Sequence, residues 1–338
     1  MMARLIPRVR ISFSAALVLV LALPVSARSS NAKDRIHLVP QFSAGQVFRY
    51  NIQLRMETTS HSAGPVVDPE GATEFDQSVN VVLRLEVLSV AGATGGPGPV
   101  RLRATYEKVA TSSKSDSYDP NAAAKERDYQ KLEGRSMEFT LHPDGKITDI
   151  KGLEDVATDP SRAVAVNQWL NQLTLGASLP QKGIAVGKKW SSKQPLESAP
   201  LTGVIWQTES TYQRDEPCPA IEMQANTDSS GKKPIAPARE ECAILSTRSK
   251  TRDSQGGRDR TPSVYRENGL RTSGEWKGSG ETLSAISLRT GMVVSVTQSS
   301  TTHMDFTVTA VASGNHIHYA GDTHSESQIT LVSGPAAP

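Results

Sequence analysis

The chain has 338 residues, and its 37 Lys and Arg nearly balance its 35 Asp and Glu, which leaves a formal charge of +2. So small a net charge does not provide the broad basic field that attracts nucleic acid, and the composition argues against a nucleic-acid partner. The length is sufficient for one large β domain or two smaller ones with a hydrophobic core.

The first 27 residues have the pattern of a secretory signal peptide. An uncharged apolar run from Ile11 to Leu23 follows three arginines, Arg4, Arg8 and Arg10. Pro24 ends the run, and Val25-Ser26-Ala27 supplies the small residues that precede a cleavage site. The alternative is a membrane anchor, but a spanning helix needs about 20 apolar residues and this run is shorter.

Cleavage after Ala27 would change both the charge and the expected location of the protein. Three arginines would be removed, which lowers the formal charge from +2 by three, to −1. No cysteine lies near the cut, so we expect an exported protein without a lipid anchor, periplasmic or extracellular. We expect no integral membrane segment in the mature chain.

The two cysteines, Cys218 and Cys242, are expected to form a disulfide, because an oxidising compartment usually joins a lone pair of thiols. Both lie at the inner ends of predicted strands, and a polar, proline-rich loop separates them. A redox or metal pair is the alternative, but the spacing is not Cys-x-x-Cys and no third ligand is near in sequence.

Apolar residues alternate with polar ones along most of the chain, which predicts half-buried β-strands. Early runs of this kind cover residues 47–57, 75–87, 100–107 and 137–141, and Asp144-Gly145 predicts a hairpin turn into residues 146–150. Later runs cover residues 204–213, 242–251, 281–288, 292–298, 304–311 and 316–332, the last of them expected to break at Gly321. One wet face per strand favours antiparallel meanders.

Two Asp-Pro pairs predict helix starts, because an aspartate can cap the helix and proline suits its first turn. They are Asp119-Pro120 and Asp159-Pro160. In the second helix a single apolar stripe is expected to pack on a sheet, formed by Ala163, Val166, Trp169, Leu170 and Leu173.

A faint duplication divides the chain into two related β-rich halves, residues 37–155 and 179–335, joined by a linking helix within residues 156–178. In each half a proline is followed by a glycine, an aromatic residue, strands and a closing turn. The second half carries a polar insertion at residues 214–241. The alternative is chance recurrence of common turns. The fold class predicted is mainly β, with antiparallel meanders forming curved sheets or half-barrels and one or two short helices.

The segment LPQKGIAVGKKW, followed later by SLRTGMVVSV, resembles a pattern of exported bacterial proteins of unknown function with a Val-Gly-x-x-Trp strand motif. These proteins are similar in architecture to periplasmic lipoprotein-carrier half-barrels, which hold acyl chains in a concave apolar face. The resemblance implies only structural roles: Gly187 in a turn, Trp190 in a strand and Gly291 in a hairpin. The polar insertion departs from the pattern.

Candidate catalytic or metal-binding residues are few. The sequence has no G-x-S-x-G, H-E-x-x-H, S-x-x-K or Walker pattern. His316 and His318 would share a strand face, and a turn at Gly321-Asp322 could bring His324 near, which makes these histidines weak candidates for zinc ligands. Ordinary histidines on an exposed hairpin are the simpler interpretation, and we expect neither a metal nor another cofactor.

These observations predict an exported, non-enzymatic β protein with a binding role, for which a hydrophobic or lipid ligand or an envelope component is the expected partner. A structural, partner-binding module is one alternative. A hydrolytic enzyme without a recognisable motif is another. A continuous apolar concavity would favour the lipid carrier, and an exposed apolar patch or edge strand would favour the partner-binding module.

Overall fold

The structure is a computed structural model that describes residues 35–39, 41–65, 72–91, 98–116, 127, 129–156, 166, 169–170, 173, 179–180, 182–196, 200–219, 240–253 and 259–333. The predicted signal peptide, residues 1–27, lies outside these ranges, as do both Asp-Pro pairs.

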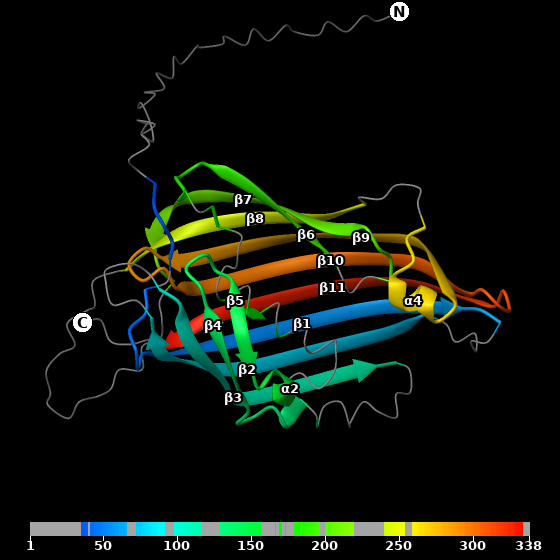
Figure 1. Cartoon of the computed structure of the whole chain (residues 1–338), viewed down its shortest axis with the longest axis horizontal. Coiled ribbons are helices and arrows are strands. Elements are labelled where there is room, and N and C mark those ends of the chain that lie inside the picture. The colour runs from blue at the N-terminus through cyan, green and yellow to red at the C-terminus, as the bar shows by residue number, and fades with distance from the viewer. Residues whose placement is uncertain are drawn as a thin grey trace, which may run out of the picture.

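The described residues form one antiparallel sheet that curves without closing, as Figure 1 shows. This confirms the predicted mainly β fold class. Its strands are β1 Val47–Ala63, β2 Thr73–Val90, β3 Val100–Ser115, β4 Ser136–Leu141, β5 Ile147–Lys151, β6 Lys189–Pro195, β7 Val204–Pro217, β8 Glu241–Asp253, β9 Leu270–Ser287, β10 Val293–Ala310 and β11 His316–Ser333.

The order of the strands is β5-β4-β3-β2-β1-β11-β10-β9-β8-β7-β6. Strands that are adjacent in the sheet are consecutive in sequence, except that β1 pairs with β11. This pairing runs from Arg49 opposite Ser333 to Ala63 opposite His318. The strands of the two predicted halves therefore belong to a single sheet. Whether the halves are related by duplication remains a prediction.

Several strands are longer than the alternation predicted. The predicted strands at 292–298 and 304–311 are one strand, β10, and β9 begins eleven residues before the predicted start at Glu281. The prediction of a break at Gly321 was wrong, because β11 continues through it and Gly321 pairs with Ser60. Small hydroxyl residues and glycines interrupt the apolar alternation in these stretches, while pairing on both sides keeps the backbone extended.

The described helices are short. They are α2, Leu153–Val156, and α4, Ser263–Glu267, which packs near the start of β9 and was not predicted. Val166, Trp169, Leu170 and Leu173 are helical and contribute to the core, as the predicted stripe required. None of the described helices is long and apolar enough to cross a membrane.

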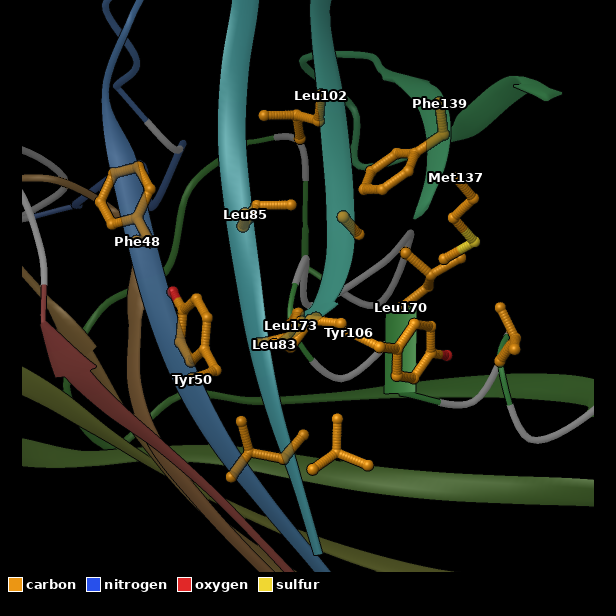
Figure 2. Close-up of a cluster of buried hydrophobic side chains, with 14 of the residues drawn as sticks. Phe48, Tyr50, Leu83, Leu85, Leu102, Tyr106, Met137, Phe139, Leu170 and Leu173 are labelled. Carbon is orange, nitrogen blue, oxygen red and sulfur yellow. The ribbon is translucent and has the colours of Figure 1, made fainter. Parts of the chain in front are cut away.

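The main hydrophobic core lies at one end of the long strands. There β1, β2 and β3 face β4 and the helical residues Val166, Trp169, Leu170 and Leu173, and Figure 2 shows side chains of this core meeting. Tyr50 is fully buried and donates its hydroxyl to the Val293 carbonyl oxygen at 3.1 Å, which ties β1 to β10 across β11. Tyr106 packs edge-on against Trp169, with ring centroids 6.4 Å apart. The core thus covers one end of this face of the sheet, and other side chains occupy the rest of the face.

Candidate ligand-binding face

The two faces of the sheet have very different side chains. We call the face that carries Phe48 and Tyr50 the core face, and the other the opposite face. The register assigns each paired residue to a face, because residues directly opposite each other in a ladder project to the same side. In β1, β2, β9, β10 and β11, every Asp, Glu, Lys, Arg and His lies at a position on the opposite face.

The middle of the core face is a band of small hydroxyl residues and glycines, which we call the hydroxyl band. Its side chains form hydrogen bonds with one another from strand to strand. Oγ1 of Thr58 lies 3.1 Å from Oγ1 of Thr323, and Oγ of Ser300 lies 3.0 Å from Oγ of Ser325. The same arrangement recurs towards the other edge in the pairs Ser210–Thr247 and Ser192–Thr208.

These contacts give the band a polar surface without charge. Because the hydroxyls bond largely to each other, the band has no need of an ionic partner. Gly278 and Gly280 leave the backbone open between the hydroxyls, and Trp206 fills the space above Gly278.

Beyond the hydroxyl band, at the far end of the core face, lies a second group of large side chains that we call the distal apolar cluster. Trp276 pairs with Met304, and Phe306 pairs with Tyr319, whose ring centroid is 5.2 Å away. Ile317 completes the cluster and is 38% exposed, and the other four members are half-buried. Side chains of this size left partly open are typical of surfaces that contact a ligand or partner.

The core face is therefore not the continuous apolar concavity expected of an acyl-chain carrier. On β9, β10 and β11 its apolar parts lie at the two ends and the hydroxyl band separates them, whereas on β1 and β2 the apolar residues Leu54, Met56 and Phe75 lie beside the band. At the near end the apolar side chains pack against the protein's own β4 and helical residues. The distal apolar cluster and the hydroxyl band are partly exposed, as are the apolar side chains of Leu54, Met56 and Phe75 beside the band.

The structure does not bring the three candidate histidines together. His316, His318 and His324 all lie on β11 and on the opposite face, but the strand is continuous, so His318 and His324 are about 20 Å apart along it. His318 lies 3.0 Å from Asp305, and His324 lies 3.4 Å from Glu326. In the part of the chain that the structure describes, no group of three His, Cys, Asp or Glu side chains could hold a metal ion.

Asp322, which the sequence analysis placed in a turn between the candidate histidines, contacts a histidine that the sequence did not single out. Nδ1 of His303 lies 2.9 Å from a carboxylate oxygen of Asp322. Nε2 of His303 is 3.9 Å from Glu275, rather than next to a hydroxyl group. Both ring nitrogens of His303 therefore face carboxylates.

The predicted disulfide is present. Cys218 and Cys242 are joined, with their Cα atoms 4.9 Å apart; Cys218 directly follows β7, and Cys242 is the second residue of β8. Cys242 is fully buried beside Ile244, Ala285 and Val294. The bridge lies at one end of the sheet and contributes to the packing there rather than to an open site.

The turn and strand positions implied by the family resemblance also occur in the structure. Gly187 lies in a turn with φ of 77°, Trp190 lies in β6, and Gly291 lies between β9 and β10 with φ of 67°. All three residues thus have the structural positions that the resemblance implied.

No protein-family description matches the chain, and no curated protein matches it. Among solved structures, a DUF1329 family protein from Desulfovibrio piger aligns with 80% of this chain and 83% of its own, at 10% identity. The TM-score of this alignment is 0.13, and we base no conclusion about fold or function on it.

The segregation of charge between the two faces escaped the sequence interpretation, although a signal for it exists. In the segment Glu275 to Glu281 the charged residues occupy odd positions, and Trp276, Gly278 and Gly280 occupy even ones. The alternation that predicts a half-buried strand is one of apolar and polar residues, and here small uncharged residues take the place of apolar ones.

Proposed function

We propose that the protein is exported and binds an amphipathic ligand on its core face, without catalysing a reaction. The observation that carries this proposal is a face without charged side chains in its five longest strands, on which a partly exposed apolar cluster adjoins a band of hydroxyls. An apolar group of the ligand would contact the distal apolar cluster, and an uncharged polar group would lie on the hydroxyl band.

Burial of apolar area would supply most of the affinity. Each fully covered side chain of the distal apolar cluster would contribute roughly 1.5–3 kcal/mol, less what it already buries in the free protein. The hydroxyl band would contribute orientation more than affinity, because its hydroxyls already bond to one another. The disulfide supports the export part of the proposal, because such bonds form and persist mainly outside the cytoplasm.

A charge placed on the core face tests the proposal. Thr302 is half-buried within the hydroxyl band, and Thr297 lies on the same strand but is exposed on the opposite face. The two variants, Thr302→Glu and Thr297→Glu, place the same charge on the same strand but on opposite faces of the sheet. We expect Thr302→Glu to abolish binding of a fluorescent fatty-acid ester or apolar dye, and Thr297→Glu to retain it.

Native mass spectrometry of the protein from its own cell supplies an independent test, since a bound amphipathic molecule would add a discrete mass. The absence of both dye binding and bound mass would refute the proposal. Formation of a dimer that buries Ile317 would instead support a partner-binding module. Circular dichroism of each variant confirms that the fold is intact.

A further inference from the structure

A group of cations on the opposite face has no anionic partner among the residues that the structure describes. Lys193 on β6 and Lys250 and Arg252 on β8 are exposed, and no carboxylate within the described ranges forms an ion pair with any of them. The flanking acidic residues are already engaged. Glu209 lies 3.0 Å from Lys189, and Glu281 lies 3.1 Å from Arg248.

The register places these cations in a defined pattern. Lys193 pairs with Gln207, which pairs with Lys250, and the row continues through Ser279 to Thr301. Lys193 and Lys250 are therefore two strands apart, about 10 Å, and Lys250 and Arg252 are about 7 Å apart along β8. Charges held on paired strands keep this spacing, unlike charges on a loop.

The row from Gln207 to Thr301 lines a shallow hollow of about 680 Å³, and Lys193 is not part of its lining. Besides Lys250 and Arg252, the lining includes Gln207, Ser279 and Thr301 and the ion-paired Glu209, Arg248 and Glu281, and it has no aromatic or apolar side chain. The hollow therefore combines positive charge with hydroxyl and amide groups that can donate and accept hydrogen bonds.

From this geometry we propose that the opposite face binds an anionic polysaccharide along the row from Lys193 to Thr301. The cations would contact carboxylate or sulfate groups, and the hydroxyl and amide side chains would contact the sugar hydroxyls. A single-stranded nucleic acid would need aromatic platforms for its bases, and the lining has none. A membrane would gain from apolar residues that insert between lipids, and these are also missing from the lining.

The test uses a fluorescent heparin oligosaccharide, titrated with the full chain at several salt concentrations. The variant Lys193→Gln/Lys250→Gln/Arg252→Gln should bind on the order of 10- to 100-fold more weakly at low salt. Its salt dependence should lose the release of about three counterions. A second variant, Lys193→Arg/Lys250→Arg/Arg252→Lys, keeps the charges and should retain binding.

The matched control is Lys108→Gln/Lys114→Gln/Lys146→Gln, which removes the same charge from exposed positions on the β3–β5 side of the sheet. It should bind the oligosaccharide as the unmodified protein does. Equal losses in both triple variants would overturn the proposal, because net charge alone would then explain binding. Binding to phosphatidylglycerol vesicles or single-stranded DNA in place of heparin would overturn it as well. Binding of the apolar dye to the core face is measured separately, so either proposal can fail alone.

Discussion

The indole ring of Trp206 on β7 lies against Gly278 on β9, across the intervening strand β8. A Cβ atom added to Gly278 would be 2.8 Å from Cζ3 of Trp206 and 3.3 Å from Cγ2 of Thr251. The glycine thus provides the space that the ring of Trp206 occupies beside the hydroxyl band.

Gly278→Ala should therefore displace the ring of Trp206 and lower the free energy of unfolding by about 1–3 kcal/mol, the usual cost of overpacking. Urea unfolding followed by tryptophan fluorescence measures the loss. The control is Ser279→Ala, whose exposed side chain lies on the opposite face and should change stability by less than about 0.5 kcal/mol. Equal stability of the two variants would show that the ring of Trp206 moves aside without a measurable loss in the free energy of unfolding.

Reduction of the Cys218–Cys242 disulfide should destabilise the protein by about 3 kcal/mol, because the open chain gains conformational freedom over the 24 residues that separate the cysteines. The double variant Cys218→Ala/Cys242→Ala should show a similar loss without reductant. Unfolding in urea, with and without dithiothreitol, measures both. Reductant should leave the double variant unchanged, and any effect on it would point to a cause other than the disulfide.

Tyr50→Phe removes the hydroxyl that bonds to the Val293 carbonyl oxygen inside the core. The carbonyl would remain buried without this partner, and we expect a loss of about 1–3 kcal/mol in the free energy of unfolding. Tyr319→Phe is the control, since Tyr319 is half-buried and no hydrogen bond of its hydroxyl occurs among the described residues. If both variants are equally stable, the contact between β1 and β10 contributes nothing measurable.

Glu138 should make stability depend on acidic pH. Its hydrogen bond with Arg103, assisted by Arg101, lowers the pKa of its carboxyl below the ordinary 4.5. A lowered folded-state pKa contributes stability above the unfolded-state value, and this contribution disappears as pH falls through the folded-state pKa.

Glu138→Gln should accordingly be less stable than the unmodified protein near neutral pH, and the difference should shrink below about pH 4.5. Denaturant unfolding of both proteins over this range is the measurement. The control is Glu281→Gln, which removes a carboxylate that is 74% exposed beside Arg248 and should change stability near neutral pH by less than about 1 kcal/mol. A difference for Glu138→Gln that persists unchanged at low pH would contradict the assigned cause.

Local patterns in the sequence were sufficient for the strands near the core. Phe48, Tyr50, Leu83 and Leu85 alternate with polar residues, and burial of one face requires that alternation. The hairpin at Asp144-Gly145 followed from the backbone freedom of glycine, and the structure has Gly145 at φ of 81°. The disulfide followed because the chain has only two cysteines, each at the end of a predicted strand.

The remaining features of the fold and of the candidate surfaces depend on pairing between distant strands. Gly278, Gly280 and Gly321 have weak strand preferences, and they remain extended because neighbouring strands bond to both of their edges. The distal apolar cluster and the row from Lys193 to Thr301 each combine residues of several strands. Register between distant strands creates such surfaces, and it depends on the whole sheet rather than on any one segment.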